Sequence, residues 1–243
     1  MVTIAQRFVN NNVDLVHAIA TAPLQAMAQE SDTIPIVGGS ISDYISPGFA
    51  ISNEAPGRNV TGTSALMPVE RQIAMLLDFL PDTQVLGIAF SSSEPNSVFQ
   101  GGLGRAAAEA AGLTVIESTV TNVNEIAQVL PSLANQVDVI WVPTDNNFAT
   151  AMDLVVQISR DTHTPLFKSD SVLTMRGAFA GLGIDWYSLG AMAAGQAIDI
   201  LLGYGEPATM PILFAQEFNY VVNQEAVDFF GMTVPERFVP FIQ

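Results

Sequence analysis

A strand that ends in a polar turn and opens a helix occurs twice in this chain. The clearest copy is Val137-Asp-Val-Ile-Trp-Val-Pro-Thr-Asp-Asn146, and Val13-Asp-Leu-Val-His-Ala-Ile-Ala-Thr21 repeats it. Each copy is followed by a helix and then by a short strand introduced by proline, at Pro165 in one case and at Pro35 in the other. Alternation of strands with helices is typical of parallel sheets. We therefore predict an α/β protein of two similar Rossmann-like lobes.

The composition is compatible with two lobes and excludes several classes of function. With 49% hydrophobic residues over 243 positions, the chain can bury one large core or two modest ones, and the repeated pattern favours two. Its net charge of −16 repels nucleic-acid phosphates and anionic lipid surfaces, so no nucleic-acid partner is expected. The absence of cysteine excludes disulfides, thiolate metal sites and cysteine nucleophiles. No apolar run is long enough to span a bilayer, and no signal peptide is recognised.

The hydrophobic pattern predicts seven strands and seven helices. The strands are expected over 13–20, 35–39, 85–90, 113–118, 137–143, 165–168 and 177–184. The helices are expected over 4–11, 23–30, 69–80, 96–111, 124–133, 147–160 and 187–202. Gly112 and Gly203 occupy positions typical of helix C-terminal caps, and Pro131 is expected to shorten or kink its helix.

Two glycine-containing segments are expected to cross between the lobes. Pro56-Gly-Arg-Asn-Val-Thr-Gly-Thr-Ser64 is typical of an extended hinge, and Gly181-Leu-Gly-Ile-Asp185 suggests a second crossing. We predict lobe 1 over 1–64 and 186–218, and lobe 2 over 65–185 and 219–243. Two strands precede Val137 in its lobe, whereas only 12 residues precede Val13. We therefore expect lobe 1 to lack its first strand–helix–strand. The alternative is a smaller first lobe.

Polar side chains gather at the predicted carboxyl ends of the strands, where open parallel sheets bind small ligands. We expect these side chains to line a cleft between the lobes. The candidates are Thr21, Ala22, Ser42, Asp43, Ser93, Glu94, Asn96, Ser97, Thr144, Asp145, Asn146, Ser169 and Asp170. Because Ser, Thr, Asp and Asn also cap helices, capping or a solvated turn is the alternative explanation for each polar candidate.

The candidate site favours a zwitterionic ligand. Asp145 is suited to pair with an ammonium group, since charge-assisted hydrogen bonds are strong, and Asp170 is its counterpart after the next strand. Helix N-termini near Thr21, or near Asn96 and Ser97, would bind a carboxylate. This combination predicts an amino acid or a similar small molecule. A capping role for Asp145 remains the alternative.

No catalytic, metal or cofactor site is expected. The only histidines are His17, which we expect in the core of a strand, and His163, which lies in a turn; neither has the spacing of a zinc site. No Gly-x-Ser-x-Gly elbow or P-loop is present, and Gly102-Leu-Gly104 lies inside a predicted helix. Several aromatic residues near the strand ends and hinge are expected to be buried in the lobe cores, and stacking on a ligand is the alternative for each. They are Tyr44, Phe90, Phe148, Trp186 and Tyr187.

A set of short motifs is distributed from residue 34 to residue 235. They are Ile34-Pro-Ile-Val37, Ser42-Asp43, Asn59-Val-Thr-Gly-Thr-Ser64, Ser93-Glu-Pro-Asn-Ser97, Val137-Asp138, Val142-Pro-Thr-Asp-Asn146, Ser169-Asp170, Arg176-Gly-Ala178, Gly183-Ile-Asp-Trp-Tyr187, Val222-Asn-Gln-Glu-Ala226 and Gly231-Met-Thr-Val-Pro235. This set resembles the ABC-transporter substrate-binding protein family that includes TrpX-like tryptophan-binding proteins.

The resemblance implies a type I periplasmic-binding fold whose two lobes close on a ligand. It also implies export to an extracytoplasmic location, usually as a lipoprotein, and delivery of the ligand to an ABC permease. We expect the protein to be a monomer. Known members bind amino acids, aromatic ones among them. Gly38-Gly39 replaces a bulkier pair that is usual in the family, so we expect a different pocket shape. The alternatives are a ligand-sensing domain of the same fold and an α/β enzyme that acts on a small polar metabolite.

Overall fold

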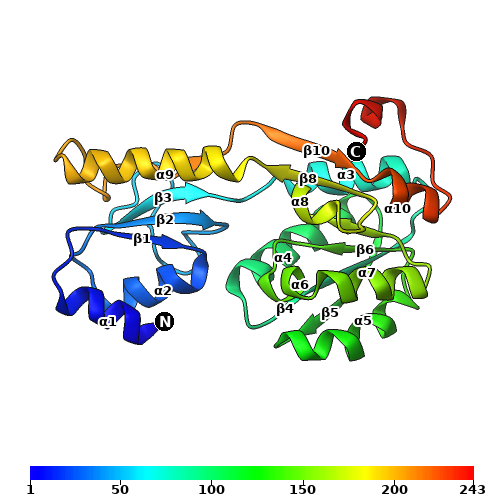
Figure 1. The fold of residues 1–243 in the computed structure, drawn as a ribbon, viewed down its shortest axis with the longest axis horizontal. Coiled ribbons are helices and arrows are strands. Elements are labelled where there is room, and N and C mark those ends of the chain that lie inside the picture. Colours follow the sequence, from blue (N-terminus) through cyan, green and yellow to red (C-terminus); the bar gives the residue numbers. More distant parts are fainter. The chain divides into compact units, whose positions relative to one another are not determined.

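The computed structural model describes residues 1–243, which form two compact units. Unit 1 contains Met1–Leu66 and Ile184–Glu217, and unit 2 contains Met67–Gly183 and Phe218–Gln243. Figure 1 shows that each unit consists of a β-sheet with helices packed against it. No helix combines the length and the apolar character that a membrane crossing requires.

The sheet of unit 1 has the strand order β1-β2-β3-β9, and each strand pairs with its neighbour in parallel. The strands are β1 (Val16–Ile19), β2 (Ile36–Ile41), β3 (Val60–Ser64) and β9 (Leu213–Phe214). The helices are α1 (Val2–Asn10), α2 (Thr21–Glu30) and α9 (Trp186–Leu201). Helix α9 covers one face of this sheet, while α1 and α2 lie on the other (Figure 1). Unit 1 is thus a three-layer α/β structure.

Tyr44 occupies the core of unit 1, and two glycines make room for it. Its hydroxyl donates to the carbonyl oxygens of Gly38 at 3.1 Å and Thr63 at 3.0 Å. A Cβ on Gly38 would lie 2.5 Å from this hydroxyl oxygen, and Gly62 has a φ of +146° where its backbone meets that of Gly38. Burial raises the pKa of Tyr44 far above its usual value. Gly38 therefore serves the packing of Tyr44.

The sheet of unit 2 has the strand order β10-β8-β7-β6-β4-β5. Its strands are β4 (Val85–Ser91), β5 (Thr114–Val120), β6 (Val139–Val142), β7 (Leu166–Lys168), β8 (Ala180–Ile184) and β10 (Phe218–Val222). The longer helices are α3 (Val69–Phe79), α4 (Pro95–Ala110), α5 (Ile126–Ala134) and α7 (Met152–Asp161). Shorter ones are α6 (Asn146–Thr150), α8 (Ser171–Thr174), α10 (Gln224–Phe229), η1 (Val123–Glu125) and η2 (Glu236–Phe241). The pairs from β5 to β8 are parallel.

Trp141 of β6 is packed in the core of unit 2. Its indole nitrogen donates to Oε1 of Gln72 at 3.1 Å, so the buried polar atom of the ring is satisfied. Gly104 of α4 faces the ring, and a Cβ at that position would overlap the Trp141 side chain. The helix predicted around Gly102 and Gly104 is therefore confirmed, and the absence of a side chain at Gly104 has a packing reason.

Three expectations from the sequence are wrong. Residues 60–64 of the expected crossing form β3, a buried strand between β2 and β9, because the β-branched Val60, Thr61 and Thr63 suit a sheet interior. The helix expected over 147–160 is divided at Ala151 into α6 and α7. His17 is exposed because β1 is an edge strand whose residues alternate between buried and exposed.

Other expectations hold in part, and some short elements were missed. Gly112 and Gly203 follow helix C-termini with φ values of +85° and +74°. The expected shortening at Pro131 is wrong, because Pro131 lies inside α5 and the helix continues to Ala134. The pattern did not predict α8, α10, β9 or β10, which are short or only partly buried.

Candidate functional site at the strand ends of unit 2

The carboxyl ends of β4, β6 and β7 lie beside one another because these strands are parallel neighbours. The segments that follow them carry most of the predicted unit 2 residues and are joined by hydrogen bonds or by close charges. We call this group the strand-end cluster. It comprises Ser91, Glu94, Asn96, Ser97, Thr144, Asp145, Asn146, Asn147, Lys168, Ser169 and Asp170.

Asp145 is buried and already bonded to protein donors. Its Oδ2 accepts from the backbone N–H of Ser91 at 2.6 Å, and its Oδ1 accepts from the Ser91 hydroxyl at 2.9 Å. Oδ1 also accepts from the N–H of Phe148 at 3.0 Å, which caps α6. With 2% of its surface exposed, Asp145 joins β4 to the turn after β6. The capping role is therefore observed, and the predicted contact with an ammonium group stays a prediction.

Glu94 presents a carboxylate at the same edge and is only partly buried. Its Oε2 accepts from the backbone N–H of Asn146 at 3.1 Å and from the Asn146 side chain at 2.8 Å. Asn96 donates to the same oxygen at 3.4 Å. All of these bonds use one carboxylate oxygen. Glu94 is thus held in place by the turn after β6 while its other oxygen makes none of these contacts.

The turn after β6 is tied to the loop after β4 and to β7. Asn96 and Ser97 both donate to the carbonyl oxygen of Thr144, each at 3.2 Å. The hydroxyl of Thr144 donates in turn to the carbonyl oxygen of Ser169 at 3.4 Å. Asn147 donates to the hydroxyl of Ser91 at 3.0 Å. The structure therefore brings together the residues that the sequence placed at these strand ends.

Ser169 and Asp170 contribute to the framework of unit 2. The Ser169 hydroxyl donates to Oε1 of Gln72 at 2.6 Å, and Gln72 also donates to the carbonyl oxygen of Leu182 at 3.3 Å. Asp170 caps α8 by accepting from the N–H of Leu173 at 2.7 Å. Gln72 was not expected from the sequence, because it lies on α3, far from these strands in the chain. The predicted ligand contacts of Ser169 and Asp170 stay predictions.

Lys168, the only lysine of the chain, is the cluster residue that sequence reasoning missed. Its ammonium donates to the carbonyl oxygens of Pro143 at 2.5 Å and Val142 at 3.5 Å. Burial lowers the pKa of Lys168 to about 8, and the nearby carboxylates of Asp170 and Asp145 oppose that shift. A lone lysine in the predicted apolar strand 165–168 was the available signal, since buried lysines need partners.

The remaining predicted residues are placed without evidence of a ligand contact. In unit 1, Thr21 and Ala22 begin α2, whose amino end has no side-chain cap. Ser42 is buried, and Asp43 accepts from the N–H of Ile45 at 2.9 Å within a turn. In unit 2, the hydroxyl of Ser93 donates to the carbonyl oxygen of Thr121 at 2.8 Å. Their ligand contacts, and the predicted cleft, stay predictions.

The aromatic residues divide into buried and exposed ones. Tyr44, Phe90 and Phe148 are buried, as predicted. Trp186 is only partly buried, and Tyr187 is 84% exposed, so for Tyr187 the expectation of burial is wrong. Tyr187 occupies the first turn of α9 next to Asp185, which caps that helix. Its ring therefore faces solvent in unit 1.

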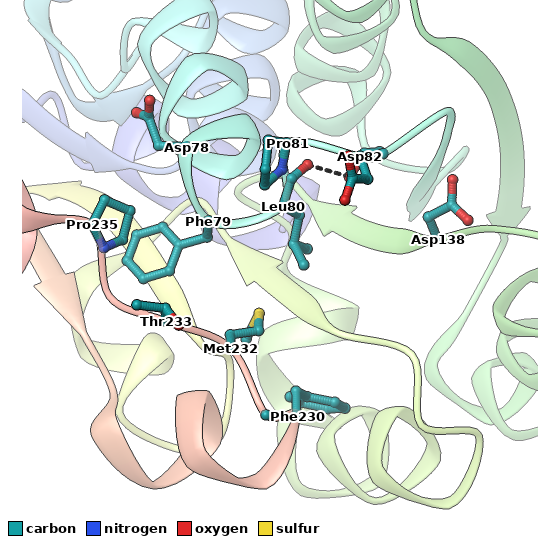
Figure 2. A pocket seen from close by; sticks show the side chains of 12 residues that line it. Asp78, Phe79, Leu80, Pro81, Asp82, Asp138, Phe230, Met232, Thr233 and Pro235 are labelled. Carbon is teal, nitrogen blue, oxygen red and sulfur yellow. Dashed lines mark hydrogen bonds between the residues drawn. The ribbon is translucent and has the colours of Figure 1, made fainter.

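A separate pocket of about 650 Å³ lies at the opposite edge of the unit 2 sheet, near the amino ends of β4 and β6. Figure 2 shows the aromatic ring of Phe79 and the Met232 side chain in its wall, with Asp82 and Asp138 at one side. The Asp138 carboxylate accepts from the backbone N–H groups of Gln84 and Val85, both at 2.8 Å. Asp138 therefore has a structural role, and this pocket is distinct from the strand-end cluster.

Comparison with known proteins gives a consistent result. The family model described as "ABC transporter substrate binding protein" matches residues 1–240. A curated relative, the tyrosine-binding protein of Clostridioides difficile, is 29% identical over 225 residues, which are 93% of this chain and 65% of the relative. The chain thus spans slightly less than two thirds of that relative's length.

Two solved structures match closely. The ABC domain from Streptococcus pneumoniae in complex with L-Trp has a TM-score of 0.94 and 32% identity, and the match covers 99% of this chain and 83% of that one. A conserved domain protein from Vibrio cholerae has a TM-score of 0.95 and 31% identity, with 100% and 81% covered.

Proposed function

Because the chain belongs to the ABC transporter substrate-binding protein family, we propose that it captures a free aromatic amino acid for uptake through an ABC permease. The predicted family and the type I periplasmic-binding fold are confirmed. The family consists of ligand-binding proteins rather than enzymes, so the enzymatic alternative is not retained. A relative named as a tyrosine-binding protein and a related domain in complex with L-Trp support an aromatic side chain on the ligand.

The observation that carries this proposal is the partly exposed carboxylate of Glu94 at the carboxyl ends of parallel strands. Asp145 was the first candidate for the ligand ammonium, but its carboxylate is buried and accepts three protein donors. Glu94 is held in position by Asn146 and keeps an oxygen that takes no part in those bonds. We therefore assign the ammonium contact to Glu94. A carboxylate-to-ammonium bond is charge-assisted and correspondingly strong.

The ligand carboxylate needs hydrogen-bond donors. The amino ends of α2 and α4 have no side-chain cap. In α2, the first N–H groups, those of Thr21 and Ala22, suit an anion. In α4, Pro95 has no N–H and the N–H of Ser97 donates to the Glu94 carbonyl oxygen at 3.0 Å, which leaves the N–H of Asn96. We propose one of these helix ends as the seat of the carboxylate. This arrangement matches both charges of an amino acid.

Transport and location form part of the same proposal. The family resemblance supports an extracytoplasmic protein that acts as a monomer and delivers its ligand to a permease. A ligand-sensing domain of the same fold is the second candidate, because sensing requires the same capture step. Co-purification with a membrane permease in the presence of L-tyrosine separates the two, since a sensor has no need of that partner.

The proposal is tested by binding measurements on protein that has been unfolded, dialysed and refolded to remove any carried ligand. L-tyrosine and L-tryptophan are added to matched samples, and glycine serves as the control. A ligand at 100 times its dissociation constant stabilises a protein by about 2.7 kcal/mol. For a chain of this size each kcal/mol raises the melting midpoint by roughly 2 to 4 °C. Shifts below about 2 °C for both aromatic amino acids, with no heat of binding, would reject it.

A further inference from the structure

Lys168 stands apart from every other charged side chain in this protein. It is the only lysine in a chain with 24 acidic residues, and 1% of its surface is exposed. Charged side chains are almost never fully buried without partners, because leaving water costs several kcal/mol per ion. The partners of Lys168 are backbone carbonyl oxygens at the end of β6. The carbonyl oxygens that stabilise the buried ammonium therefore lie directly before the turn that follows β6.

The contacts show what the ammonium holds. Lys168 bonds to the carbonyl oxygens of Val142 and Pro143, directly before the turn that contains Thr144, Asp145 and Asn146. The carboxylates of Asp145 and Asp170 are the charges that face it, one from the turn after β6 and one from the turn after β7. A single cation thus connects the end of β7 to the end of β6, and the turn after β6 bonds to Glu94.

We propose that Lys168 is a positioning residue, whose buried ammonium fixes the turn after β6 and, through Asn146, the carboxylate of Glu94. Lys168 does not touch the ligand in this scheme. The link runs from its ammonium to the Pro143 carbonyl, along the turn to Asn146, and through two hydrogen bonds to Glu94. This inference rests on the proposed function only for its effect on affinity; its effect on the turn is independent of any ligand.

The test compares three proteins: the wild type, Lys168→Met and Ser159→Ala. Methionine has a similar length and no donor. Ser159 is a matched control, because it is buried in unit 2 and its hydroxyl donates to the Thr164 carbonyl at 2.6 Å, outside the strand-end cluster. Amide hydrogen exchange is measured on the peptide 144–149, where Asn146, Phe148 and Ala149 donate bonds that hold the turn.

In Lys168→Met at pH 7, exchange in this peptide should be at least about 10-fold faster than in the wild type, since bonds to charged groups exceed 1.4 kcal/mol in most cases. Ser159→Ala should leave it unchanged. Equal protection of the turn in wild type and Lys168→Met would overturn the proposal, whether or not any ligand binds.

Affinity supplies the functional readout, with L-tyrosine and L-tryptophan as probes. Lys168→Met should bind them roughly 10- to 100-fold more weakly than wild type at pH 7. Ser159→Ala should bind them with the affinity of the wild type. Equal affinities in wild type and Lys168→Met would refute the positioning role. Failure of the wild type to bind either probe would instead reject the proposed function.

Discussion

Ser91 gives two hydrogen bonds to Asp145, one from its backbone N–H at 2.6 Å and one from its hydroxyl at 2.9 Å. Ser91 is the last residue of β4, and Asp145 caps α6 after β6. These two hydrogen bonds therefore connect the end of β4 to the turn after β6 in the buried part of the cluster. A carboxylate used in this way determines the shape of the site before any ligand arrives.

We expect Asp145→Ala to destabilise unit 2 by about 2 to 4 kcal/mol. Loss of the cap on α6 costs about 1 kcal/mol, and leaving the Ser91 donors unpaired adds about 1 to 3 kcal/mol. Urea unfolding followed by circular dichroism measures the loss. Asp153→Ala is the matched control, because Asp153 has a side chain that is 84% exposed and pairs with Arg176 on the surface. If the two variants prove equally stable, the structural role of Asp145 is wrong.

Glu94→Gln tests the proposed ammonium contact. The amide oxygen of glutamine can still accept from Asn146, so we expect little change in melting temperature. The affinity for L-tyrosine should fall by roughly 10- to 100-fold, because a charge-assisted bond becomes a neutral one. Glu109→Gln, at an exposed position in the last turn of α4, is the control and should bind normally. Unchanged affinity in Glu94→Gln would show that another residue contacts the ligand ammonium.

The sequence was sufficient to predict which strand ends carry the cluster. Apolar runs ending in polar turns located β4 and β6, and parallel order placed their carboxyl ends together. It did not reveal which polar atoms the protein itself uses. Gln72 reaches Ser169 across 97 positions of the chain, and such a contact depends on how α3 packs against the sheet. For the same reason the sequence left open whether Asp145 caps α6 or binds the ligand.

The misread segment 60–64 shows a second limit. Its glycine, threonine and serine content is typical of a loop, so it was predicted as a crossing. Its neighbours β2 and β9 supply backbone partners on both sides, and β9 is distant in sequence. Thr61 adds a hydroxyl bond to the Met210 carbonyl oxygen at 2.8 Å. Composition describes a segment alone, whereas burial in a sheet depends on its partners.

Tyr44→Phe should destabilise unit 1 by about 1 to 2 kcal/mol. The variant keeps the ring but removes the donor that satisfies the carbonyl oxygens of Gly38 and Thr63 in the core. Tyr204→Phe is the matched control, since Tyr204 is 79% exposed and its hydroxyl can bond to water. The melting temperatures of the two variants, each compared with that of the wild type, measure the loss of stability. A neutral effect of Tyr44→Phe would show that another donor reaches those carbonyl oxygens.

Two glycines of α4 should respond in opposite directions to alanine. A Cβ at Gly104 would overlap the Trp141 ring, so Gly104→Ala should destabilise unit 2 by about 1 to 3 kcal/mol through overpacking. A Cβ at Gly102 would meet nothing within 4 Å. Gly102→Ala should therefore stabilise the helix by about 0.5 to 1 kcal/mol. Urea unfolding of both variants tests the pair, and stabilisation by Gly104→Ala would contradict this packing.

The buried lysine also makes the stability of the fold depend on pH. Burial lowers the pKa of Lys168 to about 8 in the folded protein, whereas an unfolded lysine has a pKa of about 10.4. Between these values the unfolded chain binds more protons than the folded one. The free energy of unfolding contributed by this group therefore rises with pH across that window and is constant below it.

The variant Lys168→Met has no titrating group at this position. The free energy of unfolding of the wild type minus that of the variant should therefore increase from pH 8 to pH 10. Urea unfolding of both proteins at pH 7, 8, 9 and 10 measures this difference, in which other titrating groups cancel. A difference that falls, or stays flat, across this range would mean that Lys168 is not buried as a cation in the folded protein.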